Sequence, residues 1–121
     1  GSIMKTMTVA AGIDAGEIQP YDSYNDQGFL TIDTFTISNV SKQCIGYNTF
    51  TNALSFSCNV GMIRIVQKLG RALFYKYLTD FGFGELTGIT LAGEISPKIE
   101  PYERNKDREA CSEYQCWIIR R

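Results

Sequence analysis

The sequence contains no histidine, and this absence excludes more chemistry than any other feature of its composition. Catalysis by Ser-His-Asp or Cys-His groups is excluded, and so is every metal site that needs an imidazole ligand. Any proton transfer must therefore use Lys, Asp, Glu, Tyr, Cys or a chain terminus.

A strong net charge and a long apolar run are also missing. Lys and Arg number 12 and Asp and Glu number 13, for a formal net charge of -1. No global basic field is available to hold nucleic acid, so we expect no nucleic-acid partner. No apolar run approaches the ~18–20 residues that span a bilayer. The chain opens with Gly-Ser-Ile-Met-Lys and not with a signal peptide, so we expect a fragment, a processed product or a cloning scar at Gly1-Ser2.

Cysteine is scarce and has no metal-binding spacing. The four cysteines are Cys44, Cys58, Cys111 and Cys116. A zinc site without histidine would need all four or help from carboxylates, so we expect no metal and no cofactor. Small secreted disulfide scaffolds are denser in cysteine than this chain. We therefore expect free thiols.

Apolar spacing predicts four helices in a chain of 121 residues, a length typical of one domain. They are expected at Ser2 to about Ala15, Phe50 to about Phe56, about Val60 to Leu69, and along a stripe from Leu73 to Phe81. The expected buried stripe of the first helix is Met4, Met7 and Ala11. Gly16 and Gly70 are placed to end the first and third helices, and Thr49 or Thr51 to cap the second. The third helix is apolar on more than one side, which predicts a central, buried position.

Strands are expected to be few. Phe29–Ile37 is rich in β-branched and aromatic residues, and its apolar parity changes at Asp33-Thr34, which predicts a short β-hairpin. The segments 17–28, 38–46 and 85–96 are expected to be loops, with one short strand at Ile89–Leu91. The pattern therefore predicts a mainly α (α+β) fold.

Two short motifs could carry chemistry without histidine. Ser2-Ile-Met-Lys5 is S-x-x-K, and Ser57-Cys-Asn59 is S-x-N at the junction of two expected helices. Positions i and i+3 share a helix face, so the Lys5 amine could reach the Ser2 hydroxyl at a helix start. Such a lysine acts as a base only if burial or nearby cations lower its pKa. Taken singly, each motif has a plainer interpretation, with Ser2 and Asn59 as helix caps and Lys5 on a solvated helix face.

The surrounding sequence resembles the transpeptidase domain of penicillin-binding proteins. Gly1 to Lys5, followed by a helix of small residues, is similar to the nucleophile segment of that family, and Asn52–Met62 is similar to its S-x-N segment. Further matching segments follow in the order seen in class B transpeptidases of the division and elongation type. They are Leu69-Gly70, Phe74–Leu78, Phe81–Gly84, Thr87–Ile89 and Leu91–Glu94.

This resemblance implies a role for each motif residue. Ser2 would be the nucleophile that forms an acyl-enzyme with a D-Ala-D-Ala stem peptide of peptidoglycan or with a β-lactam. Lys5 would take the proton of Ser2, and Ser57 would relay a proton towards the leaving group. Asn59 would bind Lys5 or the acyl amide of the substrate. The Ser2 backbone N–H would form half of the oxyanion hole.

The third motif of this superfamily, K-T-G, does not occur in the sequence. We therefore expect residues 1–103 to form part of a transpeptidase domain, with the nucleophile helix and the helical subdomain present and the central sheet largely missing. Residues 104–121 are expected to form a divergent tail. An α-amino group on Gly1 would oppose the helix dipole and fray the first turn around Ser2. We expect little or no turnover from this chain as written.

An alternative is a non-catalytic helical binding module on the same scaffold. Its apolar helices would then expose surface that the missing sheet would cover, which predicts self-association or a partner. A third possibility, an unrelated small α domain with a Gly-Ser tag, fits poorly with the ordered matches from Asn52 to Glu94. By resemblance, the parent enzyme would be anchored at the outer face of the bacterial cytoplasmic membrane.

Overall fold

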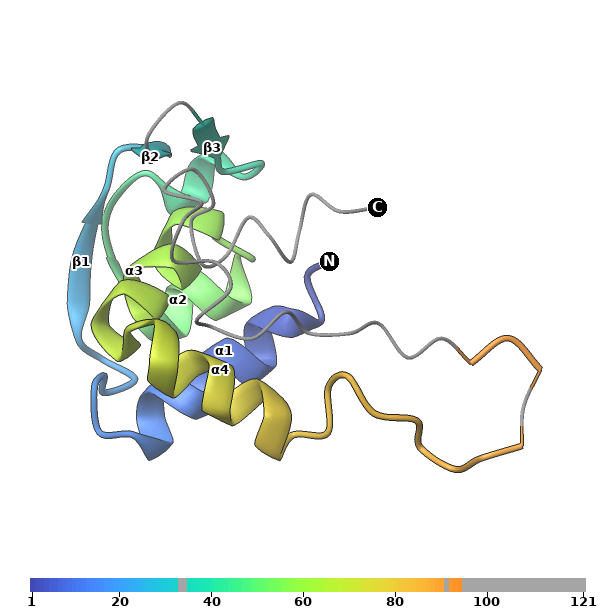
Figure 1. The fold of residues 1–121 in the computed structure, drawn as a ribbon. Coiled ribbons are helices and arrows are strands. Elements are labelled where there is room, and N and C mark those ends of the chain that lie inside the picture. The colour runs from blue at the N-terminus through green and yellow to red at the C-terminus, as the bar shows by residue number, and fades with distance from the viewer. Residues whose placement is uncertain (33–34, 91, 95–121) are drawn as a thin grey trace.

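A computed structural model describes residues 1–32, 35–90 and 92–94 of the chain (Figure 1). In chain order the elements are α1 (Met4–Asp14), β1 (Ser23–Asp26), β2 (Phe29–Ile32), β3 (Phe35–Ser38), the 3₁₀ turn η1 (Lys42–Cys44), β4 (Gly46–Thr49), α2 (Phe50–Ser55), α3 (Asn59–Leu69) and α4 (Arg71–Asp80). The expected mainly α fold is confirmed. The tail expected at 104–121 lies outside the described residues.

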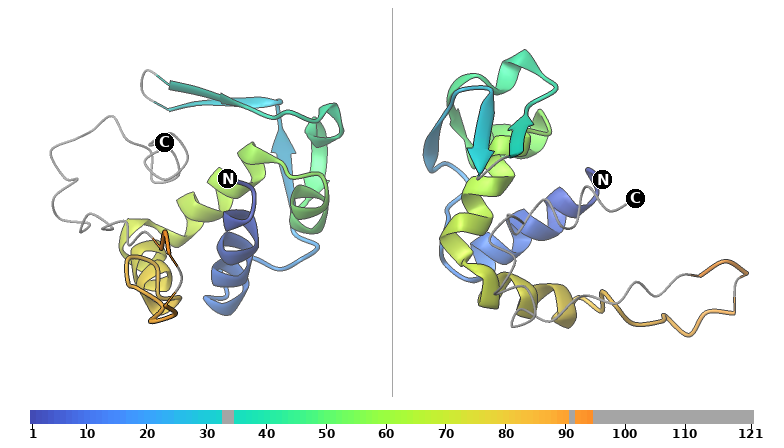
Figure 2. Two further views of the ribbon diagram at one scale, coloured as in Figure 1. Left: turned by 90° about the vertical axis from the view of Figure 1, so that its right-hand side faces the viewer. Right: turned by 45° about the horizontal axis from the view of Figure 1, so that its top comes forward.

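Helix α3 is the centre of the core, as its apolar pattern predicts. It contacts α1, α2, α4 and the strands β1 and β3. Its buried residues are Val60, Gly61, Met62, Ile63, Ile65, Val66 and Leu69. In both views of Figure 2, α3 begins beneath the β2–β3 hairpin and runs away from it towards α4. The N-terminal end of α3 is therefore the end that meets the strands.

Helix α1 packs on α3 through a face that includes Ala11, as predicted, but otherwise differs from the predicted stripe. Met4 and Met7 are only half-buried. The buried residues of α1 are Lys5, Thr8, Val9, Ala11 and Gly12. A Cβ atom added at Gly12 would lie 2.7 Å from Cγ2 of Ile65, so the glycine permits a close approach of the two helices. This approach fixes the buried face and places Lys5 on it.

Both ends of α1 are closed by backbone hydrogen bonds. Gly16 has φ +73°. Its N–H donates to Ile13 O at 3.0 Å, while the Glu17 N–H donates to Gly12 O at 3.0 Å, a Schellman motif that confirms the predicted stop. At the other end, the N–H groups of Met4 and Lys5 donate to Gly1 O and Ser2 O at 3.1 and 3.2 Å. The first turn is therefore hydrogen-bonded in this structure, and the fraying expected from an α-amino group on Gly1 stays a prediction.

The β structure among the described residues forms two separate two-stranded antiparallel sheets. Strands β2 and β3 pair with Phe29 opposite Ser38, which confirms the predicted hairpin. Strands β1 and β4 pair with Ser23 opposite Thr49. Strand β1 lies in a segment expected to be loop, and β4 follows the loop expected at 38–46, where no strand was expected. Their polar sequences, SYND and GYNT, have no apolar alternation that would indicate strands. The strand expected at Ile89–Leu91 is absent at residues 89 and 90, and Leu91 lies outside the described residues.

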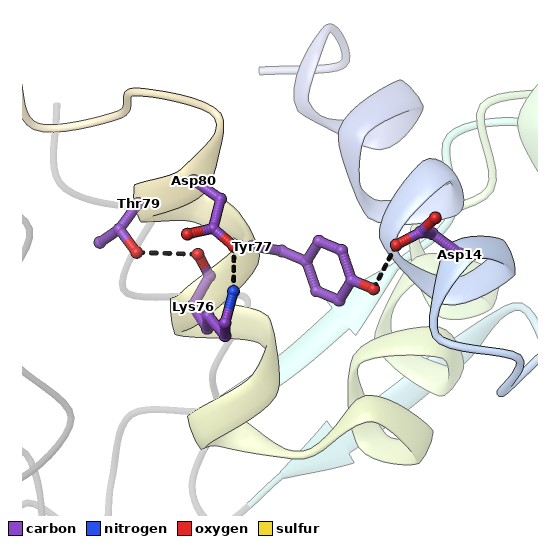
Figure 3. Close-up of polar contacts among 5 residues, drawn as sticks. All are labelled: Asp14, Lys76, Tyr77, Thr79 and Asp80. Atoms are coloured by element: carbon purple, nitrogen blue, oxygen red, sulfur yellow. Dashed lines mark hydrogen bonds and ion pairs between the residues drawn. The ribbon is translucent and has the colours of Figure 1, made fainter.

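Helix α4 is held against α1 by a polar contact as well as by its buried residues Phe74 and Leu78. The Tyr77 hydroxyl donates to Oδ2 of Asp14 at 2.6 Å (Figure 3). This hydrogen bond is the main reason that the pKa of Tyr77 is raised. Lys76 pairs with Asp80 one turn further along the exposed face of α4. The two helices thus frame the side of the core opposite the hairpin.

The expected free thiols are wrong for two of the four cysteines. Cys44 and Cys58 form a disulfide, with their Cα atoms 5.6 Å apart. Both residues are fully buried. The bond links the end of η1 to the N-cap of α3, a contact between segments that sequence spacing does not bring together. Cys111 and Cys116 lie outside the described residues.

Candidate active site

The Lys5 side chain is buried at the junction of α1, α2 and α3, with 4% of its surface exposed. Its Nζ donates to Ser57 Oγ at 2.8 Å, to Ser57 O at 2.7 Å and to Asn59 Oδ1 at 2.7 Å. An ammonium has three donors and no acceptor, so these three contacts use its full hydrogen-bonding capacity. The lysine of S-x-x-K thus contacts both polar residues of S-x-N across more than 50 residues of chain.

Ser57 connects Lys5 to Ser2. Its Oγ donates to Ser2 Oγ at 3.2 Å, and the Ser2 side chain is exposed. The side-chain hydrogen bonds therefore run from Ser2 to Ser57 to Lys5. This order differs from the direct Ser2–Lys5 pair that helical spacing alone would suggest.

Ser57 adopts a backbone conformation that is unfavourable for a residue with a side chain. Its φ is +58°, the only positive value at a non-glycine residue of the part described. The Ser57 N–H donates to Leu54 O at 3.1 Å and the Cys58 N–H donates to Ala53 O at 2.8 Å, so α2 ends in a second Schellman motif. Glycine is usual at this position. The serine at this position has a strained backbone, and its hydroxyl contacts Lys5. Backbone strain of this kind clusters at functional sites.

We expect the free energy of unfolding of Ser57→Gly to be about 1 kcal/mol higher than that of Ser57→Ala. Both variants lose the hydroxyl, but only glycine adopts the left-handed backbone without strain. Chemical denaturation of the two variants measures the difference. Gly16→Ala is the matched control, since Gly16 occupies the same position of α1 in open space, and it should lose about the same amount. Equal stabilities of the two Ser57 variants would contradict the assigned strain.

Asn59 is the first residue of α3, and the N-cap is Cys58. The plain interpretation of Asn59 as a cap is therefore wrong. Its Nδ2 donates to Ser38 O at 2.8 Å, which leaves Oδ1 directed to Lys5. The disulfide occupies the side chain of Cys58, which makes no cap hydrogen bond. The S-x-N turn is thus held by α2, by β3 and by the disulfide.

Burial lowers the pKa of Lys5 from its ordinary value of 10.5. Within the described residues, all three acceptors of Lys5 are neutral, and no carboxylate bonds to it. A lysine in this setting can lose its proton more readily than an exposed one and can then accept a proton from a hydroxyl. Among the described residues, no group of three His, Cys, Asp or Glu side chains is placed to hold a metal ion.

The described surface also has a hollow that does not belong to this site. It has a volume of about 520 Å³, lies between β1, α2 and α3, and is lined in part by Tyr24, Phe50 and Arg64. None of the four motif residues lines it. None of the described helices is long and apolar enough to cross a bilayer.

Sequence reasoning found Ser2, Lys5, Ser57 and Asn59, and the structure brings these four side chains together. Comparison with known families shows to which family the chain belongs. The model of the penicillin binding protein transpeptidase domain matches residues 1–110. The chain belongs to this family.

Relatives and solved structures agree with this membership. The chain is 32% identical over 105 residues to Stage V sporulation protein D of Bacillus subtilis, covering 86% of this chain and 16% of that protein. It is 30% identical over 104 residues to the penicillin-binding protein PbpB of Mycolicibacterium smegmatis, covering 86% of this chain and 16% of the relative. The chain therefore spans less than a fifth of the length of these transpeptidase-family relatives.

Two solved structures show the same fold. The transpeptidase domain of Burkholderia pseudomallei penicillin-binding protein 3 matches with a TM-score of 0.76 at 22% identity, over 90% of this chain and 33% of that chain. Pseudomonas aeruginosa PBP2 in complex with WCK 5153 matches with a TM-score of 0.72 at 22% identity, over 93% of this chain and 26% of that chain. The helices and small sheets described above thus belong to a transpeptidase fold.

Proposed function

We propose that this chain is the nucleophile-bearing part of a D,D-transpeptidase that cross-links peptidoglycan through a serine acyl-enzyme and binds β-lactams. The observation that carries the proposal is the buried Lys5 ammonium, which bonds to both Ser57 and Asn59 while Ser57 bonds to Ser2. Histidine is absent from the sequence, so the base must be another group, and Lys5 is the buried amine beside the serines.

In the proposed reaction, Ser2 Oγ attacks the carbonyl carbon of the bond between the two D-Ala residues. The proton of Ser2 passes to neutral Lys5 Nζ as the C–O bond forms. Ser57 Oγ, hydrogen-bonded to both groups, relays a proton from Lys5 to the departing D-Ala amine as the C–N bond breaks. An amine of a second stem peptide then attacks the acyl carbon. The new C–N bond forms, the C–O bond to Ser2 breaks, and a proton from the amine returns to Ser2 Oγ. Asn59 binds Lys5 or the acyl amide of the substrate; in this structure its Oδ1 accepts from Lys5 and its Nδ2 donates to Ser38 O.

The isolated chain is proposed to turn over little or no substrate. The sequence has no K-T-G, the motif whose strand supplies the second oxyanion donor in this superfamily. One such donor is worth ~10²–10³ in kcat. The Ser2 side chain is exposed, which is consistent with a site that is completed by a further strand.

The test has two arms, both read by mass spectrometry after incubation with a labelled penicillin. The chain alone is expected to show no stoichiometric adduct, and an adduct on Ser2 would overturn its inactivity. In the second arm, residues 1–103 replace the matching segment of Mycolicibacterium smegmatis PbpB, a penicillin-binding protein by name. This PbpB chimera should form one adduct on Ser2 and none after Ser2→Ala. A folded chimera without an adduct would falsify the proposed chemistry, with unmodified PbpB as the positive control.

The disulfide bears on where the protein works. Disulfides persist in oxidising compartments and are rare in the cytosol. A buried Cys44–Cys58 bond therefore supports the proposal that the parent enzyme is membrane-anchored with this domain at the outer face of the cytoplasmic membrane.

The alternative, a non-catalytic binding module, has one observation in its favour. Several apolar side chains are exposed, among them Ile3 at 82% and Val40 at 95%. A binding module is expected to self-associate through exposed apolar side chains. Gel filtration coupled to light scattering measures this, and a clean monomer would count against the alternative.

A further inference from the structure

Helix α3 is capped by a side chain from another element. The Cys58 side chain is engaged in the disulfide and cannot cap the helix. Instead, Oδ1 of Asn39, the residue that follows β3, accepts the Val60 N–H at 3.0 Å. Val60 is the second residue of α3, and its N–H is one of the four that an α-helix leaves without an internal partner. Asn39 therefore performs from a distance the task that an N-cap side chain performs locally.

The orientation of the Asn39 amide is set by Asp26 at the end of β1. Asp26 is 1% exposed, and its Oδ1 accepts both the Gly28 N–H at 2.8 Å and Asn39 Nδ2 at 2.9 Å. Its Oδ2 accepts the Tyr24 hydroxyl at 3.3 Å. A carboxylate accepts hydrogen bonds, so the donor end of the Asn39 amide, Nδ2, must face Asp26. The Asn39 carbonyl oxygen is thereby left for Val60.

The same stretch of chain also orients Asn59. The carbonyl oxygen of Ser38, the neighbour of Asn39, accepts Asn59 Nδ2 at 2.8 Å. Asn59 must then turn its Oδ1 to Lys5, which it contacts at 2.7 Å. The Asn39 N–H donates to Gly28 O at 2.8 Å and fixes this stretch to β2. Two adjacent residues thus hold the first two residues of α3, one through a side chain and one through a backbone carbonyl.

From these contacts we infer that Asn39 is a positioning residue for the acyl-transfer site and that buried Asp26 fixes it. The Asn39 side chain bonds to Asp26 and Val60, and not to Lys5 or Ser2. It acts through Val60 and through the Ser38 carbonyl, which together keep Asn59 Oδ1 and Ser57 on the lysine. The effect of Asn39 on catalysis rests on the proposed function. Its structural role, to cap α3 at Val60 and to keep the partners of Lys5 in place, does not depend on that function.

The first experiment uses the 121-residue chain and NMR, and needs no activity. Asn39→Ala should speed hydrogen exchange of the Val60 amide by about 2- to 30-fold, the range that loss of an N-cap produces. The same variant should change the titration midpoint of Lys5 Nζ, because Asn59 and Ser57 are no longer held against it. Thr36→Val is the matched control on β3: it removes the Thr31–Thr36 side-chain hydrogen bond and should change neither readout.

Conservative variants of Asp26 separate orientation from general destabilisation. Asp26→Asn keeps an acceptor for Asn39 and Gly28 and can donate to the Tyr24 hydroxyl, so it should keep both readouts near those of the unmodified chain. Asp26→Ala should behave as Asn39→Ala does. An Asn39→Ala chain that melts normally and leaves Val60 exchange or the Lys5 titration unchanged would overturn the inference.

The second experiment measures acylation of the PbpB chimera. Asn39→Ala should slow penicillin acylation of Ser2 by about 10-fold or more, in line with the loss of supporting contacts around reactive groups. Acylation at the unmodified rate would overturn the catalytic consequence. A chimera that forms no adduct even with Asn39 intact would count against the proposed function, while the Val60 and Lys5 measurements would still decide the positioning role.

Discussion

Lys5→Met in the PbpB chimera is expected to lower the rate of penicillin acylation of Ser2 by about 10²–10⁴-fold, the usual contribution of a positioned general base. Methionine has a similar length and no polar head, so it fills the space between α1 and α3 without offering a base. The change also leaves Ser57 Oγ and Asn59 Oδ1 without their donor. Stopped-flow measurement with a labelled penicillin reads the rate directly.

Lys5→Arg separates a base from a fixed cation. Arginine keeps the positive charge but is not deprotonated in proteins. If Lys5 takes the proton of Ser2, Lys5→Arg should be about as slow as Lys5→Met. A variant that keeps acylation within about 10-fold of the unmodified rate would show that only the charge matters. Lys76→Met is the control, because Lys76 lies on the exposed face of α4, where it pairs with Asp80, and its loss should leave acylation unchanged.

The pH dependence of acylation follows from the burial of Lys5. Burial lowers the pKa of this lysine below 10.5, and the neutral amine is the form that accepts a proton. The rate should therefore rise with pH, with a midpoint below 10.5, and this rising limb should disappear in Lys5→Arg. The same shift acts on stability: the unfolded chain binds the Lys5 proton more tightly, so this group favours folding increasingly as pH rises from the lowered pKa towards 10.5. A limb that persists in Lys5→Arg would belong to another group.

The helices and their ends could be predicted because their signals are local. Gly16 and Gly70 end α1 and α3 as expected, and Thr49 caps α2 by accepting the Asn52 N–H at 3.2 Å. The apolar residues on several sides of α3 required a buried central helix. Each of these predictions depends on residues within about one turn of one another.

The features that could not be predicted depend on contacts between distant segments. Strands β1 and β4 are polar and short, and each is a strand only because it pairs with the other. The buried face of α1 includes Lys5 because Gly12 lets α1 lie close to α3, which the spacing of methionines does not reveal. The left-handed backbone of Ser57 is set by the end of α2. Periodicity within one segment contains none of this information.

The candidate site divides in the same way. The motif residues were found through S-x-x-K, S-x-N and the ordered matches around them. Asn39 and Asp26 were missed, because an Asn in a loop and an Asp in a polar strand have many ordinary roles. The available signal was that Cys58 lies where an N-cap side chain is expected, which leaves the start of α3 without a local cap.

The largest expected effect on stability comes from the pair of cysteines that sequence reasoning took for free thiols. Replacing both Cys44 and Cys58 with alanine should lower the free energy of unfolding by about 3 kcal/mol, the loss of loop-closure constraint for a loop of about 15 residues. The closed loop spans a sequence separation of 14, begins at the last residue of η1 and contains β4 and α2. Loss of the disulfide would also remove the covalent link between η1 and the N-cap of α3.

The measurement is best made in a chain with Cys111→Ser and Cys116→Ser, so that Cys44 and Cys58 are the only cysteines left. Urea unfolding of this chain with and without dithiothreitol should show a loss of about 3 kcal/mol. The alanine pair should lose at least as much and should not respond to dithiothreitol. Both sulfur atoms are fully buried, so the alanine pair also loses packing, and reduction alone does not. If reduction leaves the unfolding midpoint unchanged, the cross-link contributes nothing and the loss in the alanine pair is packing. Agreement between the two losses assigns the stability to the bond that ties η1 to the S-x-N turn.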